Sequence, residues 1–202
     1  MAGRFLVIDG PDGAGKTTQA MRIAEYLRAR GEEVVTLREP GATPAGEAIR
    51  ELLLDADTDV TPLTEMLLYQ AARAQVVETV IRPALAQGHS VVLDRYWYST
   101  AAYQAHGLGL DPASVRHVSA VATGGVEPDH VFFLDLDAEV GLARLGGERD
   151  RIEGRPLAYH RRVRDGFLVE ARALGGRATI LDANQPAEDV AAAIRAVLER
   201  LP

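Results

Sequence analysis

Phe5-Leu-Val-Ile-Asp-Gly-Pro-Asp-Gly-Ala-Gly-Lys-Thr-Thr18 is an apolar run that breaks into glycines and then continues as helix-like sequence. From Gly10 the spacing is Gly-x-x-x-x-Gly-Lys-Thr, which ends at Thr17. In this motif backbone N–H groups hold phosphates, the lysine reaches the outer ones and the threonine hydroxyl binds Mg²⁺. The motif requires a strand before it and a helix after it, and the flanking patterns supply both. The stretch therefore predicts a phosphate-binding loop.

The amino-acid composition supports the prediction of a phosphate-binding loop. Lys and Arg together total 22, and all of them except Lys16 are arginines. Arginine is a wide planar fork, whereas lysine is a compact charge on a flexible stem that suits the gap between two phosphates. A high-GC genome explains the arginines but not the single exception.

Length, charge and cysteine content limit the number of domains and the classes of function that the chain can have. A chain of 202 residues fits one α/β domain, so we expect a single domain over 1–202. The net charge of −7 argues against binding nucleic acid through a broad basic surface. The absence of cysteine excludes disulfides and thiolate metal sites and fits a cytoplasmic location. No apolar run approaches roughly 18 residues, so no membrane association is expected.

The rest of the chain alternates between strand-like and helix-like patterns. Strands are expected at 5–8, 34–37, 90–94, 131–134 and 178–181. Helices are expected over 16–30, 48–54, 65–81, 137–145 and 163–174. Two more should begin at 112 and at 186. Pro83 should end or kink the third helix, and Asp111 and Asp137 should cap the helices that follow them. This alternation predicts a three-layer α/β fold with a five-stranded, mostly parallel sheet.

Charged residues follow two of the predicted strands. Arg38-Glu39-Pro40-Gly41 follows the second strand, and Asp94-Arg95 ends the third. Open α/β sheets bind ligands at the carboxyl ends of their strands. There Asp94 is placed to hold a magnesium ion through its waters beside Thr17, and Arg95 to face a phosphate. A surface turn and a structural ion pair are the plainer alternatives.

Three further segments suit a nucleotide site but also have ordinary explanations. Tyr69 and Arg73 lie one turn apart on a helix, where core packing and a solvated ion pair would account for them. Residues 97–104 combine aromatic and hydroxyl groups that suit a base and a sugar, or equally an interior. The segment 144–155 has the charges and glycines of a lid over a nucleotide, or of an exposed loop.

The loop alone does not choose among switches, motor ATPases and small-molecule kinases. The guanine-reading pattern Asn-Lys-x-Asp cannot occur, because Asn184 is followed by Gln and Lys16 is the sole lysine. A motor ATPase usually has further domains, for which this length leaves little room. A kinase of small phosphorylated acceptors needs a second anionic pocket and a lid, and the arginines at 38, 73, 95, 149 and 151 meet that need.

The motifs follow the order and spacing of bacterial thymidylate kinases, which the chain resembles over nearly its whole length. They are 5–18, 38–41, 69–73, 94–96 with 99–104, and 150–153. The resemblance implies a P-loop kinase that phosphorylates dTMP to dTDP with Mg-ATP and is a homodimer, with which the broad apolar face of helix 65–81 is compatible. Two alternatives remain, a kinase of the same fold for another nucleoside monophosphate and a non-catalytic nucleotide-binding regulator.

The resemblance implies a site with donor, acceptor and metal parts. The residues implied to bind ATP are Gly10, Pro11, Asp12, Gly13, Ala14, Gly15, Lys16, Thr17 and Thr18. Those implied to bind the acceptor are Asp9, Arg38, Glu39, Pro40, Tyr69, Arg73, Arg95, Ser99, Thr100, Tyr103 and Gln104. Mg²⁺ would be held by Thr17 and Asp94, and catalysis would fall to Lys16, Asp9, Arg95, Arg149 and Arg151.

The resemblance also implies individual roles. Arg38 and Arg95 would hold the acceptor phosphate. Tyr69 would stack on thymine. Arg73, Thr100 and Gln104 would make the polar contacts with this base. Tyr103 would crowd the 2′ position, and Asp9 would lie near the acceptor sugar and the metal.

Two departures from the family pattern bear on the lid and on the turn after the second strand. Relatives supply a catalytic arginine from the loop or from the lid, and because this loop has Asp12 instead, Arg149 or Arg151 is expected to act. The lid is short and poor in arginine. Ala42 stands where a second glycine is expected.

Overall fold

A five-stranded parallel sheet forms the centre of the protein. The computed structural model describes residues 3–146 and 150–201. The strands are β1 (Phe5–Asp9), β2 (Val34–Arg38), β3 (Ser90–Asp94), β4 (His130–Asp135) and β5 (Ala178–Asp182). They lie in the order β2-β3-β1-β4-β5, and every neighbouring pair is parallel. The predicted fold class is confirmed, and each predicted strand is present to within one residue at either end.

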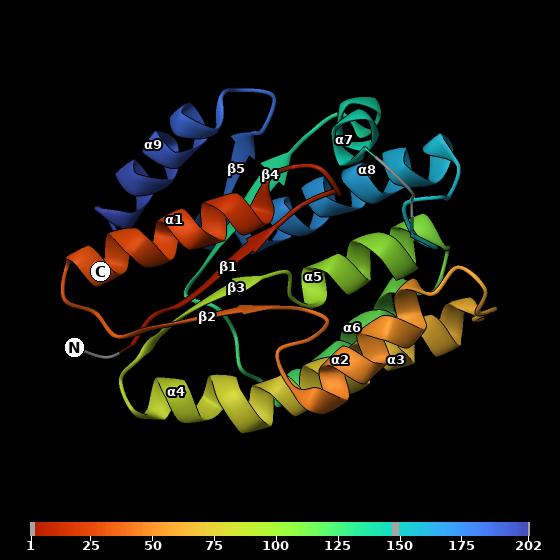
Figure 1. The fold of residues 1–202 in the computed structure, drawn as a ribbon, viewed down its shortest axis with the longest axis horizontal. Helices are drawn as coiled ribbons and strands as arrows, with labels where there is room; N and C mark the ends of the chain where they lie inside the picture. Colours follow the sequence, from red (N-terminus) through yellow and green to blue (C-terminus); the bar gives the residue numbers. More distant parts are fainter. Residues whose placement is uncertain (1–2, 147–149, 202) are drawn as a thin grey trace.

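The sheet is covered on both faces because alternate side chains of the central strands point in opposite directions. Leu6 and Ile8 pack with α1 (Lys16–Ala29) and α9 (Ala187–Leu198) in one core cluster. Phe5 and Val7 pack in the other cluster, with α8 (Leu157–Leu174) and the helices after β2. Figure 1 shows α1 and α9 together on one side of the sheet and α2, α3, α4 and α6 on the other side.

A long helical rod follows α2 (Pro44–Leu54). It consists of α3 (Pro62–Val76), the π-helical turn η1 (Val77–Ile81) and α4 (Arg82–Ala86) in unbroken succession. Of the two outcomes expected at Pro83, an end or a kink, the helix does not end there but continues to residue 86. Pro83 lies in the first turn of α4, directly after the wide π turn, where a missing N–H is tolerated.

The segment 97–107 is helical, which the sequence pattern did not reveal. It comprises α5 (Trp97–Thr100) and the π-helical η2 (Ala101–Gly107), and α6 (Pro112–Thr123) follows. Asp111 caps α6 as predicted, since its carboxylate accepts a hydrogen bond from the Ser114 N–H at 2.9 Å. Ser99 and Thr100 of α5 and Tyr103 and Gln104 of η2 all line one cavity.

The last third of the chain contains α7 (Ala138–Leu145), α8, the short 3₁₀ turn η3 (Gly175–Arg177) and α9. Asp137 stands at the N-terminus of α7 but does not cap it as predicted. Its carboxylate pairs instead with Arg164 of α8, which also donates to Asp135 at 2.6 Å. None of the described helices is long and apolar enough to cross a membrane.

Candidate active site

The loop between β1 and α1 has the close backbone packing that its glycines permit. A Cβ on Gly10 would lie 2.5 Å from the Leu134 carbonyl oxygen, and one on Gly13 would lie 2.3 Å from that of Gly141 in α7. Both glycines also have positive φ, at 143° and 76°. Gly15, at φ 87°, occupies the N-cap of α1, so the unpaired N–H groups of the first turn face the loop. The loop is thus a preformed anion site.

Lys16 is held inside this loop. Its Nζ donates to the Pro11 carbonyl oxygen at 2.6 Å, and the side chain is buried. Burial lowers the pKa of Lys16 to about 8, and the neighbouring Arg95 acts in the same direction. A phosphate beside the ammonium would favour its charged form.

Thr17 and Asp94 join the loop to the carboxyl end of β3. The Thr17 hydroxyl donates to Asp94 Oδ2 at 2.6 Å. The other carboxylate oxygen, Oδ1, is buried and has no hydrogen-bond partner among residues 3–146 and 150–201. Both residues line the cavity at the loop. A carboxylate oxygen without a partner beside a hydroxyl is a donor set that fits Mg²⁺.

Two cavities meet at this edge of the sheet. The larger, of about 400 Å³, is the loop cavity, and part of its lining is Gly13, Gly15, Lys16, Thr17, Thr18, Arg38, Glu39 and Arg144. The smaller, of about 120 Å³, is the second cavity, and its lining includes Pro40, Leu54, Tyr69, Ser99, Thr100, Tyr103, Gln104 and Ile152. Asp12, Arg50 and Arg95 line both. These three residues therefore mark the boundary across which two bound molecules would face each other.

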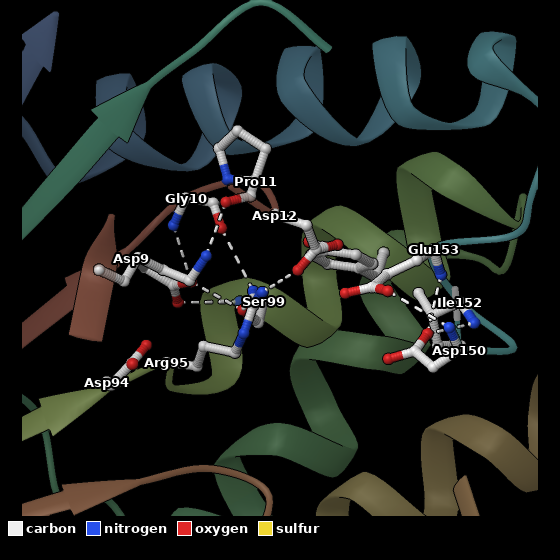
Figure 2. Close-up of polar contacts among 12 residues, drawn as sticks. Asp9, Gly10, Pro11, Asp12, Asp94, Arg95, Ser99, Asp150, Ile152 and Glu153 are labelled. Carbon is white, nitrogen blue, oxygen red and sulfur yellow. Dashed lines mark hydrogen bonds and ion pairs between the residues drawn. The ribbon is translucent and has the colours of Figure 1, made fainter. Parts of the chain in front are cut away.

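Arg95 is fixed at this boundary. Its φ of 71° turns the side chain back towards the loop, where Nη1 donates to Gly10 O at 3.2 Å and Ser99 Oγ at 3.1 Å. Its Nη2 pairs with Asp12, whose other oxygen accepts the Tyr103 hydroxyl at 2.6 Å. Figure 2 shows Arg95 between Asp9 and Asp12, with the lid residues beyond Asp12.

Arg50 of α2 is a site residue that sequence reasoning missed. It lines both cavities, and Nη1 donates to Pro40 O at 3.2 Å. Burial lowers the pKa of Arg50, and the nearby charges of Arg38 and Arg95 lower it further. Three guanidinium groups that repel one another around a cavity indicate an anion site. A helical position between Ile49 and Glu51 carried no sequence signal for this role.

Asp9 lies below the loop, and its assignment to the acceptor sugar and the metal stays a prediction. Its side chain is fully buried and lines neither cavity. One oxygen accepts the Gly10 N–H at 2.9 Å and the Ser99 hydroxyl at 2.7 Å, and the other accepts the N–H groups of Tyr96 and Ser99. Asp9 therefore ties the loop to the start of α5 from below. Asp12, at the cavity boundary, is the carboxylate placed to meet a ligand.

Arg73 also lies behind the cavity wall. Its side chain is 2% exposed and donates to Glu39 at 2.7 Å, Gln70 at 2.8 Å and Thr100 at 2.9 Å. Burial raises the pKa of Glu39 to about 7 despite the opposing charge of Arg73. Arg73 thus supports Thr100, which lines the second cavity, whereas Arg38 and Glu39 line the loop cavity.

The described part of the lid closes the far side of the second cavity through Asp150, Ile152 and Glu153. Arg149 lies outside the described residues. Arg151 Nη1 pairs with Glu65 at 2.7 Å and its Nε donates to Leu53 O at 2.9 Å. In this arrangement Arg151 anchors the lid to α2 and α3 and lines neither cavity.

Comparisons with known proteins identify the family. The family model described as Thymidylate kinase matches residues 8–194. The thymidylate kinase of Deinococcus radiodurans is 47% identical over 201 residues, which cover 98% of each chain. That of Thermosynechococcus vestitus is 45% identical, over 98% of this chain and 87% of its own. The crystal structure of thymidylate kinase from Ehrlichia chaffeensis matches with a TM-score of 0.81 and 31% identity, over 98% of this chain and 99% of the other. This chain belongs to the thymidylate kinase family.

Proposed function

We propose that the protein transfers the γ-phosphoryl group of ATP to thymidine 5′-monophosphate, which gives thymidine diphosphate and ADP. The observation that carries this proposal is the boundary of Asp12, Arg50 and Arg95, which joins a phosphate-binding cavity to a second one lined by aromatic and amide groups. A switch or an ATPase would need only the first cavity. A kinase of a nucleoside monophosphate needs both.

The loop cavity holds the donor. Backbone N–H groups from Gly13 to Thr18 bind the phosphates, and Lys16 exchanges its Pro11 contact for phosphate oxygens. Thr17 and Asp94 would hold Mg²⁺, since one Asp94 oxygen has no hydrogen-bond partner among the described residues. The bound ion would neutralise charge on the β- and γ-phosphates.

The second cavity holds the acceptor. Arg50 and Arg95 bind its phosphate, with Arg38 nearby, and a phosphate oxygen attacks the γ-phosphorus while the bond to the β–γ bridging oxygen breaks. The electron pair of that bond leaves with ADP. Tyr69 offers a ring to stack on the base, and Tyr103 fills the space beside the sugar.

The lid completes the site within a single domain, over about residues 144–155. Phosphoryl transfer depends on positioning and on charge stabilisation, and the phosphate loop itself contains no arginine. We assign the missing charge to the lid. Since Arg151 already pairs with Glu65, Arg149 is the better candidate and Arg151 the anchor.

The test is ADP release from Mg-ATP with a panel of nucleoside monophosphates as acceptors. We expect rapid release with dTMP, much slower release with dCMP, dGMP and dAMP, and almost none without an acceptor. Release that does not depend on the acceptor would remove the kinase proposal. Preference for another base would remove only the assignment of thymidylate.

A homodimer formed through α3 and α6 is part of the proposal. These helices pack on each other, joined by a hydrogen bond of 2.7 Å from Gln70 to Ser119. Outward from this contact they expose Leu63 at 55%, Leu67 at 47% and Val121 at 71%. Exposed apolar side chains on two helices that pack together favour an interface between copies. Light scattering should give twice the chain mass, and Val121→Glu should give the monomer mass.

A further inference from the structure

Glu65 is a fully buried carboxylate to which neither the sequence motifs nor the proposed reaction assigns a role. It lies in the first turn of α3 and has 0% exposure. Its Oε1 accepts Gln104 Nε2 at 2.9 Å and Arg155 Nη1 at 3.3 Å. Its Oε2 accepts Arg155 Nη2 at 2.6 Å and Arg151 Nη1 at 2.7 Å. One carboxylate therefore joins two lid arginines to a residue of the acceptor cavity.

The two guanidinium groups keep Glu65 a pure acceptor. A buried carboxylate retains its charge only when it is paired and hydrogen-bonded, and two arginines provide that pairing here. An ionised carboxylate has no proton to donate. The side of Gln104 that faces Glu65 must therefore be its NH₂ group.

This contact fixes which end of the Gln104 amide faces the cavity. Side-chain amides can be turned by half a rotation with little change in shape, so a partner must determine the orientation. With the NH₂ group held by Glu65, the carbonyl oxygen of Gln104 remains for the ligand. Gln104 lines the cavity beside Thr100, whose oxygen accepts a hydrogen bond from Arg73 and whose hydroxyl donates to no acceptor within residues 3–146 and 150–201. The wall thus offers an acceptor and a donor side by side.

We propose that Glu65 is a positioning residue for base specificity, acting by holding the Gln104 amide with its carbonyl oxygen towards the acceptor cavity. This inference rests on the proposed function. The imide edge of a pyrimidine-2,4-dione has an N–H donor next to a carbonyl acceptor, which complements such a wall. A cytosine edge has a ring-nitrogen acceptor next to an amino donor. Against this wall it would place acceptor opposite acceptor and donor opposite donor. A buried polar mismatch of this kind disfavours the wrong ligand strongly.

The test compares dTMP with 5-methyl-dCMP, since the two differ only in that edge. Glu65→Gln gives position 65 an N–H donor and so allows the Gln104 amide to turn around. We expect the ratio of kcat/KM for dTMP to that for 5-methyl-dCMP to fall by at least about 10-fold. A folded Glu65→Gln protein whose ratio stays within about twofold of the wild-type value overturns the proposal.

A double-mutant cycle shows whether Glu65 acts through Gln104. In a Gln104→Ala background, Glu65→Gln should leave the ratio unchanged, because no amide remains to be oriented. A fall of the same size in both backgrounds would contradict the mechanism. Glu170→Gln is the matched control, because Glu170 is also a buried carboxylate paired with an arginine, Arg116 at 2.7 Å, and lies outside the cavity. It should cost stability and leave the ratio unchanged.

A measurement on the wild-type protein covers the case in which Glu65→Gln does not fold. With dTMP bound, NMR should detect scalar coupling through the hydrogen bond between Gln104 Nε2 and the Glu65 carboxylate carbon. Absence of this coupling, with the Gln104 amide resonances assigned, overturns the proposal. Failure of the proposed function would look different, because the wild-type enzyme would then not prefer dTMP in the acceptor panel.

Discussion

The donor and acceptor sides of the site are built in different ways. The donor side is one continuous stretch from Gly10 to Thr18, whose ligands are mainly backbone N–H groups set by glycines and the start of α1. The acceptor side is assembled from side chains of five segments: the turn after β2, α2, α3, the α5–η2 helix and the lid. Among the residues that the structure describes, Asp12, Arg50 and Arg95 are the ones that line both cavities.

This difference separates general from specific recognition. Backbone groups read phosphate, which every nucleotide carries, so a contiguous loop suffices. Side chains read the base and sugar, and each of them needs support from behind: Arg73 for Thr100, Glu65 for Gln104 and Asp9 for the start of α5. Substitutions on the acceptor side should therefore change specificity and acceptor affinity more than they change ATP binding.

Alanine substitutions of the two lid arginines should give the largest change in kinetics, and each should change a different constant. Arg149→Ala should lower kcat by about 10³-fold with little change in ATP binding, because an arginine supplied to the transferring group contributes at this level. Arg151→Ala should mainly raise KM for dTMP, since Arg151 anchors the lid to Glu65. Steady-state kinetics with both substrates varied will measure this. If both single variants keep near-normal turnover, and the double variant does too, the lid is not the source of the charge.

A second comparison tests the boundary between the cavities. Arg50→Ala should reduce kcat/KM for dTMP by about 10²-fold, because Arg50 lines both cavities in a partly buried site. Arg38→Ala is the matched control, since the Arg38 side chain is 55% exposed and pairs with Glu47 at 3.6 Å. It should cost about 10-fold or less, because an exposed charge is screened by solvent. Equal losses in the two variants would contradict the placement of Arg50.

The buried pair of Glu39 and Arg73 gives the protein a pH-dependent stability. The pKa of Glu39 is about 7 when folded and 4.5 by reference, so between these values the folded chain binds more protons there than the unfolded chain. Raising the pH through this range should therefore lower the free energy of unfolding, by at most about 1.4 kcal/mol per pH unit. Urea unfolding of the wild-type and Glu39→Gln proteins will measure the difference. A wild-type slope no steeper than that of the variant would show that Glu39 does not titrate in this range.

The smallest effect concerns the turn between β2 and α2. Ala42 has a φ of 65°, in the left-handed region that disfavours a side chain, and its N–H donates to Glu47 at 2.9 Å. Ala42→Gly should stabilise the fold by about 0.5–1 kcal/mol, because relief of this strain exceeds the added freedom of the unfolded chain. Thermal unfolding with unchanged kcat is the expected readout. A lower melting temperature would show that the turn is not strained.

The same contrast determines what could be predicted from sequence. The loop from Gly10 to Thr18 and the five strands were predictable because local spacing and apolar runs encode them. Arg50 could not be found, since a helix interior gives no sign of which cavity its side chain will reach. The role of Asp9 was implied by the family resemblance alone, and its spacing gave no sign of the four hydrogen bonds that its buried carboxylate accepts. The helical course of 97–107 was missed because its wide π turns break the usual apolar period.

In the proposed reaction, donor and acceptor meet at Asp12, Arg50 and Arg95. A ligand in which adenosine and thymidine are joined through their 5′ oxygens by a polyphosphate chain would span both cavities. Calorimetry should show that it binds at least about 100-fold more tightly than ATP or dTMP alone, because one binding event fills two adjoining cavities. Arg50→Ala should remove most of that gain. An affinity no greater than that of the tighter-binding single nucleotide would contradict the proposal that donor and acceptor meet at these three residues.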